Sequence, residues 1–216
     1  MIKNCISETS FYSVFIDSNE KIDTEMEAFL VKLPEELKRL MDYFGITSID
    51  KKITINIHTD LDEFKNFYES LGHGSYKDYV VGCALNYEIN LLDFKEYSKT
   101  QCHHNDTVED FLKVIVHEMV HICHQNLQPD MEKVAWFMGE GLATYLANQR
   151  YSLDEKIDFP KEVYFGGSEA FKQIRSPYCF AQKFVRMLVD KFPREKVLKY
   201  ACDAEKLKED WEIIWT

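Results

Sequence analysis

The stretch VIVHEMVHICHQ, residues 114–125, places three histidines and one glutamate in a run that otherwise has the composition of a hydrophobic core. Its apolar residues cover most of the circumference of a helix, which predicts a central, buried helix. A capping box from Thr107 to Asp110 marks the expected start of this helix, and Pro129 follows its expected end near Gln125. Ionisable side chains that are buried without partners are strongly destabilising, so we expect something to satisfy them.

The spacing of His117 and His121 predicts a metal site. Residues four apart lie one turn apart on the same face of a helix, so the two imidazoles can reach one ion. Glu118 lies roughly 100° further round the helix, close enough to act on a water beside that ion without ligating it. Zinc uses this arrangement of nitrogen ligands, an open position and a carboxylate base. The alternative is a pair of histidines hydrogen-bonded within a core.

His124 shares the face of these histidines but does not fit the same ion. It is seven residues from His117, which places it roughly 10 Å further along the helix axis. We therefore interpret His124 as a partly exposed residue near the helix C-terminus, where a proton is favoured. Cys102, His103 and His104 are interpreted as an exposed loop and not as a second metal site, because adjacent side chains point apart.

Glu140 is the predicted third ligand. Eighteen residues separate it from His121, enough for one helix to end and a second helix to return beside the first. Gly139, Gly141 and Ala143 are small, so the second helix can pack closely against its neighbour. Thr144 continues the face of Glu140 one turn later and is expected to support that ligand. The alternative is that Glu140 is an ordinary surface carboxylate.

The pattern of the whole chain predicts an α+β fold, with strands and helices mixed in residues 1–94 and helices alone in residues 95–216. Strands are expected over 11–16 and 52–58, the second of them half-buried, and 79–94 predicts a strand pair or one long bent strand. Helical patterns cover 20–44, ended or kinked at Pro34 with a second helix stopping at Gly45, and then 60–71, 107–125, 136–150, 167–174, 177–191 and 194–214.

Length, charge and composition narrow the class of protein. A chain of 216 residues predicts a single domain. The net charge of −11, from 26 basic and 37 acidic residues, argues against nucleic acid or an anionic membrane as the main partner. The N-terminal residues do not have the pattern of a signal peptide, and no apolar run approaches a membrane span, so we expect a cytoplasmic protein. The six scattered cysteines are expected to be free thiols, several of them buried.

These motifs resemble those of the gluzincin zinc metallopeptidases, and are similar to the aminopeptidase N and small peptidase MA-like groups. The likeness rests on HEMVH at 117–121, the eighteen-residue gap and GEGLATY at 139–145, and it covers about residues 50–192. It implies a zincin-like domain over 1–216 that binds one Zn²⁺ per chain. The implied roles are zinc ligation by His117, His121 and Glu140, and general-base catalysis by Glu118.

The resemblance also implies a small mixed sheet whose edge strand runs over the active-site cleft and pairs with an extended peptide. The candidate strand lies within VVGCALNYEINLL, and its residues nearest the substrate would be Gly82, Cys83, Ala84, Leu85 and Asn86. In aminopeptidases an acidic residue that anchors the free amino group stands where this chain has Leu85. We therefore do not expect a dedicated aminopeptidase.

A tyrosine downstream of Glu140 is the further catalytic residue that the resemblance suggests, as a donor to the oxyanion. The candidates are Tyr145, Tyr151, Tyr164 and Tyr178. Tyr145 lies about 140° round the helix from Glu140 and points away from the metal. Tyr178 follows Pro177 at a predicted helix start, which gives it a fixed position, so we favour Tyr178.

The expected function is zinc-dependent hydrolysis of a peptide or protein substrate. One alternative is a non-catalytic relative of the gluzincins that binds peptides without cleaving them; the intact Glu118 favours the enzyme. A zinc-stabilised structural protein is disfavoured, because three ligands leave the fourth position open. The sequence does not set the oligomeric state.

Overall fold

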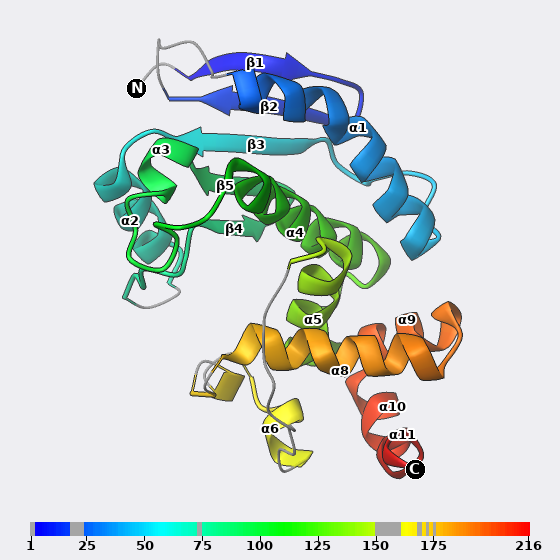
Figure 1. Ribbon diagram of the computed structural model, residues 1–216. Helices are drawn as coiled ribbons and strands as arrows, with labels where there is room; N and C mark the ends of the chain where they lie inside the picture. The colour runs from blue at the N-terminus through cyan, green and yellow to red at the C-terminus, as the bar shows by residue number, and fades with distance from the viewer. Residues whose placement is uncertain are drawn as a thin grey trace.

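The computed structural model describes residues 3–17, 24–72, 75–149, 161–167, 170–171, 173–174 and 176–216. Five strands in the first half form one mixed sheet, and helices make up the second half (Figure 1), which confirms the α+β expectation. The strands are β1 (Asn4–Glu8), β2 (Tyr12–Ile16), β3 (Ile53–His58), β4 (Gly82–Leu85) and β5 (Glu88–Leu92). β1 was not expected from the sequence, because its side chains are only partly buried and its pairing is interrupted by a register shift between Cys5 and Ser7.

The strand order is β1-β2-β3-β5-β4, which places β4 at an edge of the sheet. The central pairs, β2 with β3 and β3 with β5, are parallel, whereas the outer pairs are antiparallel. Residues 79–94 thus contain a strand pair and not one bent strand. The turn between β4 and β5 consists of Asn86 and Tyr87, with φ of 52° and 67°. Two consecutive left-handed residues are the geometry that matches the twist of a tight hairpin.

The expectation that β3 is half-buried is wrong. Its apolar residues Ile53, Ile55 and Ile57 are buried, but Asn56 and His58 on the opposite face are also only 4% and 7% exposed. The helix α2 (Leu61–Ser70) lies against that second face, where Phe64 and Phe67 contact the ring of His58. Asn90 of β5, together with Lys3 for Asn56 and Asp17 for His58, provides polar partners for these two side chains, so polar residues are accommodated inside the sheet layer.

The helix α1 (Thr24–Phe44) continues through Pro34 as one element, so the expected pair of helices is also wrong. Its buried residues before and after Pro34 include Leu30, Leu33 and Leu37, which form one uninterrupted stripe. Pro34 itself is exposed. Packing of the stripe against the core therefore outweighs the hydrogen bond that proline removes. Gly45 ends the helix with a φ of 68°, as expected from sequence.

The long helix α4 (Val108–Leu127) connects the two halves of the fold, because it packs on α1, on the strands β4 and β5, and on α5 (Trp136–Leu146). In Figure 1, α4 crosses the front of the sheet, and α8 (Pro177–Lys191) lies against α5 below it. The remaining elements are α3 (Phe94–Tyr97), the 3-10 turn η1 (Met131–Lys133), α6 (Lys161–Phe165), α9 (Arg194–Cys202), α10 (Ala204–Glu209) and α11 (Trp211–Trp215).

Three further expectations concern the C-terminal half and the chain as a whole. The predicted helix over 194–214 is divided into α9, α10 and α11, and much of the helix predicted over 167–174 lies outside the described residues. All six cysteines are free, and Cys123 and Cys179 are buried. Among the described residues, no helix is both long and apolar enough to cross a lipid bilayer.

Candidate metal centre

The helix α4 begins as the sequence predicts. The Thr107 side chain accepts from the main-chain N–H of Asp110, and the Asp110 carboxylate accepts from that of Thr107, so both halves of the capping box are present. Most of the helix is buried, including His117 at 8% and Glu118 at 6% exposed. The ionisable side chains therefore enter the core on a helix whose apolar residues fix it there.

His117, His121 and Glu140 meet at one point, with one ligand atom from each lying within 4.8 Å of the others. The Nε2 atoms of the two histidines are 3.2 Å apart. The Glu140 carboxylate lies 3.3 Å from Nε2 of His117 and 3.7 Å from Nε2 of His121. The packing of α5 against α4 brings the glutamate to the two histidines.

These separations fit a zinc ion. Two ligands of a tetrahedral zinc with bonds of about 2.0–2.1 Å stand about 3.3 Å apart. The 3.2 Å between the two Nε2 atoms and the 3.3 Å from Nε2 of His117 to Oε2 of Glu140 are close to that edge length, and the other carboxylate oxygen, Oε1, lies 3.7 Å from Nε2 of His121. Two imidazole nitrogens and one carboxylate oxygen are also a donor set that zinc accepts, and three protein ligands leave a fourth position open.

A residue that the sequence analysis did not identify orients the first histidine. Nδ1 of His117 lies 3.0 Å from Oε1 of Gln149, just beyond the end of α5. An amide oxygen only accepts, so Nδ1 carries the hydrogen and Nε2 keeps its lone pair for the metal. Gln182 of α8 donates to the main-chain oxygens of Thr144 and Gln149, and so ties this segment to the neighbouring helix.

Burial and the neighbouring charges shift the pKa values of His121 and Glu140 in opposite directions. Burial alone lowers the pKa of His121, but the nearby Glu140 carboxylate outweighs burial and raises that pKa to about 9. For Glu140, burial raises the pKa, and the charge and hydrogen bonds of the two histidines more than reverse this and hold it well below its usual range. His121 and Glu140 thus stabilise each other's charged forms, and a bound cation would take the place of the proton on His121.

Glu118 faces the edge strand. Burial is the main cause that raises the pKa of its carboxyl group, partly offset by His117 and His121. A Cβ atom built on Gly82 of β4 would stand 3.2 Å from Oε1 of Glu118 and 2.8 Å from Cδ2 of Leu91. Because Gly82 has no side chain, the Glu118 carboxylate can lie directly beneath the strand.

The five residues predicted on the edge strand do not occupy equivalent positions. Gly82 and Ala84 share a face with Leu91 and Ile89, and this is the face on which Gly82 meets α4. Cys83 and Leu85 point to the opposite face, and Leu85 is 42% exposed. Asn86 lies in the hairpin turn and not in the strand.

Tyr178 is the predicted tyrosine that lies beside the cluster. Its ring packs edge-on against His117, with centroids 6.3 Å apart. Ser176 has a left-handed φ of 55° and Pro177 begins α8, so the backbone that leads into Tyr178 is strongly constrained. Tyr164 is instead buried against Phe137 and Trp211, and Tyr151 lies outside the described residues.

The expectation about His124 is wrong, and the structure shows how Thr144 contacts Glu140. His124 is not partly exposed; it is fully buried, its Nε2 lies 3.1 Å from the main-chain oxygen of Ala201 in α9, and burial lowers its pKa to about 4. The Thr144 hydroxyl is also fully buried and bonds to main-chain oxygens of Glu140 and Gly141. Its contact with the ligand is therefore through the backbone of α5.

The comparisons with known proteins add no relative: no protein-family model, no curated protein and no solved structure matches this chain. The function is therefore inferred from the geometry of the site and from the motifs of the sequence.

Proposed function

We propose that this protein is a zinc-dependent peptidase of the gluzincin type, with a zincin-like catalytic domain. The observation that carries the proposal is that His117, His121 and Glu140 bring one ligand atom each to within 4.8 Å of the others, with the Glu118 carboxylate on the helix of the two histidines facing the edge strand. A structural zinc site would use four protein ligands. The described residues supply three at this point, as a catalytic site requires.

Zinc, when bound by these residues, supplies a Lewis acid that activates water and polarises a carbonyl group. Glu118 accepts the proton of the attacking water and returns it to the leaving amine. Tyr178 donates its hydroxyl hydrogen to the oxyanion, from its place beside His117. The edge strand β4 offers main-chain groups to an extended substrate, which holds the scissile bond over the cluster.

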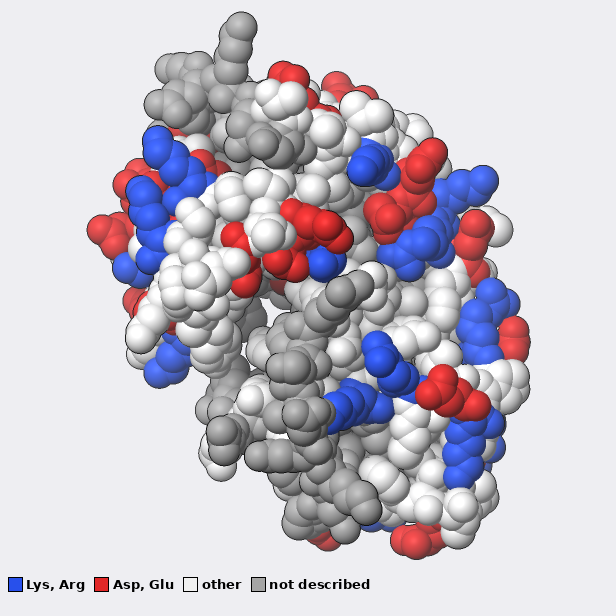
Figure 2. Space-filling view, in the orientation of Figure 1, with Lys and Arg blue, Asp and Glu red and all other residues white. Residues whose placement is uncertain are grey.

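Charge supports a peptide as the substrate. The net charge is −11, and on the face shown in Figure 2 the described acidic and basic side chains are interspersed. A nucleic-acid substrate would favour a continuous basic surface. Because Leu85 replaces the acid that anchors an amino terminus, we propose internal cleavage. Hydrolysis of N-acetylated peptides as fast as free ones supports this, and a strong preference for the free amine contradicts it.

The test of the proposed function compares the wild type with two variants. Elemental analysis should find one zinc per chain in the wild type and in Glu118→Gln, and none in the His117→Ala, His121→Ala double variant. Digestion of a peptide library should then show cleavage by the wild type alone. Zinc bound without cleavage would support the peptide-binding alternative, and absence of zinc from the wild type would refute both.

A further inference from the structure

A row of aromatic rings leads from the metal cluster to the surface. Tyr178 packs against His117 on one side and, edge-on at 6.5 Å, against Tyr79 on the other. The Phe171 ring also packs edge-on against Tyr178, with centroids 5.3 Å apart. Tyr79 is the outermost ring of the row and is 40% exposed, so it presents an apolar surface to whatever enters beside the cluster.

Tyr79 lies three residues before β4, in the segment that leads into the edge strand. A substrate paired with the strand near Gly82 would therefore pass close to this side chain. The hydrogen bond from Leu92 N to Val81 O extends the β4–β5 pairing back toward Tyr79 by one residue. The ring is thus at the end of a fixed strand and not at the tip of a long loop.

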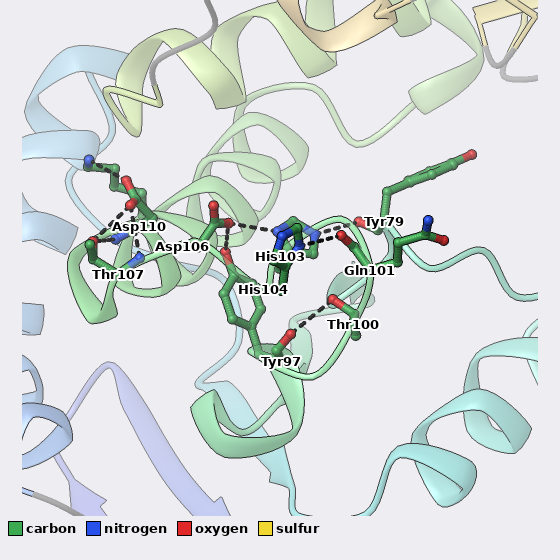
Figure 3. A network of polar contacts seen from close by, with 10 residues as sticks. Tyr79, Tyr97, Thr100, Gln101, His103, His104, Asp106, Thr107 and Asp110 are labelled. Atoms are coloured by element: carbon green, nitrogen blue, oxygen red, sulfur yellow. Dashed lines mark hydrogen bonds and ion pairs between the residues drawn. The ribbon is translucent and has the colours of Figure 1, made fainter.

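A polar network lies beside the backbone of Tyr79 (Figure 3). Nε2 of His103 lies 3.4 Å from the main-chain oxygen of Tyr79, and Nδ1 of the same ring lies 2.8 Å from Asp106 Oδ2. The buried Tyr97 donates its hydroxyl to Asp106 and stacks on the His103 ring at 4.5 Å. Figure 3 shows the Tyr79 ring directed away from this network. The network therefore lies against the main chain of Tyr79 and leaves the Tyr79 ring available.

We infer that Tyr79 and Tyr178 form the wall of a subsite that selects an aromatic or large aliphatic side chain next to the scissile bond. Aromatic pairs gain from edge-to-face contact in addition to buried area, which favours such side chains over alanine. His103 is a positioning residue that acts through the Tyr79 main chain. The inference rests on the proposed function, because the substrate is taken to be a peptide held over the cluster.

The test measures binding, so that it is independent of turnover. Zinc-loaded Glu118→Gln protein is titrated calorimetrically with acetylated, amidated peptides that carry phenylalanine or alanine at each of the two positions flanking one bond. We expect the phenylalanine peptide to bind about tenfold more tightly at one of these positions. Adding Tyr79→Ala should abolish most of this ratio, and Tyr79→Phe should restore it.

A matched control is the exposed aromatic Phe11, at 42% exposure beside the far edge of the sheet. Phe11→Ala should leave the ratio unchanged, whereas His103→Ala should reduce it without loss of zinc. If the ratio of the affinities for the phenylalanine and alanine peptides is the same with and without Tyr79→Ala, the inference is overturned. If the selective binding is found but the wild type cleaves no peptide, the subsite stands and the proposed hydrolysis fails. If the wild type cleaves peptides but the Glu118→Gln protein binds the phenylalanine and alanine peptides equally, the proposed hydrolysis stands and the subsite fails.

Discussion

Nδ1 of His117 and Oε1 of Gln149 are 3.0 Å apart, although the two residues belong to different segments of the chain. The bond fixes both the orientation of the imidazole and the nitrogen that carries the hydrogen. Gln149 is in turn held through its main-chain oxygen by Gln182 of α8. The position of His117, the proposed metal ligand on α4, thus depends on the packing of α8, which is distant in sequence.

Replacement of Gln149 by leucine should weaken zinc binding by about 10–100-fold, because the acceptor that orients His117 is lost. Gln149→Glu keeps an acceptor at this place and should bind zinc much more tightly than the leucine variant. Competition with a chromophoric chelator measures the affinities. Gln101→Leu, in an exposed loop, is the control. If the leucine variant and the wild type bind zinc equally well, Gln149 does not contribute to the metal site.

Tyr178→Phe should lower kcat by about 10²–10³ while zinc affinity changes little, because a phenylalanine ring keeps the packing against His117 and loses only the hydroxyl. Steady-state kinetics with a fluorogenic peptide and a zinc titration measure the two quantities. Tyr145→Phe removes a hydroxyl on the Glu140 helix near Tyr43 of α1 and should leave kcat unaffected. Unchanged turnover in Tyr178→Phe would exclude it as the oxyanion donor.

The two glycines that flank Glu140 should respond in opposite directions to alanine. A Cβ on Gly141 would lie 2.5 Å from the main-chain oxygen of Ala181 in α8, so Gly141→Ala forces α5 and α8 apart and should cost about 1–3 kcal/mol of stability. A Cβ on Gly139 would meet nothing closer than 3.9 Å, so Gly139→Ala should stabilise by about 0.4–1 kcal/mol. Urea unfolding of both variants measures the difference, and a Gly141→Ala protein as stable as Gly139→Ala would contradict the close packing.

His124 should make the protein sensitive to moderate acid. Burial lowers its folded-state pKa to about 4 from an ordinary 6.5, so the unfolded state takes up the proton first as pH falls. Stability should be lost progressively from about pH 6.5 down to about pH 4, with about 2–3 kcal/mol gone by about pH 4.5. The measurement is urea unfolding of the chelator-treated protein at pH 7 and pH 4.5.

His124→Leu is the comparison for this pH effect. It should be less stable than the wild type at pH 7, because it loses the bond to Ala201, but its stability should fall by about 2–3 kcal/mol less between the two pH values. Since both proteins are free of metal, protonation of the metal ligands contributes equally. Parallel losses in the two proteins would show that His124 does not set the acid sensitivity.

Local patterns predicted the parts of the site that local physics determines. The spacing of His117 and His121 on one helix, and the capping box at Thr107, depend only on residues within a few turns, and the structure has both. The prediction of Glu140 as the third ligand required one further assumption, namely that the helix after the loop, α5, returns beside α4. Small residues at the contact, above all Gly141 against Ala181, are the physical signal for that return.

The errors arose where a distant segment decides the environment. His124 has the sequence context of a helix end exposed to water, but α9, some 77 residues later, covers it. Asn56 and His58 alternate with isoleucines as in a half-buried strand, yet α2 and Asn90 bury and satisfy them. Gln149 carries no motif of its own, and only the need of a histidine ligand for an acceptor could have directed a search toward it.

The place of β4 at the edge of the sheet has a consequence for the behaviour of the protein in concentrated solution. A strand with one open side can pair with a second copy of the chain as readily as with a peptide, and such pairing is a common route to aggregation. β4 has only four residues, Gly82–Leu85, and begins with a glycine. Its shortness limits the number of main-chain hydrogen bonds that a second copy can make. The edge that we propose for binding a peptide is therefore too short to support stable self-association.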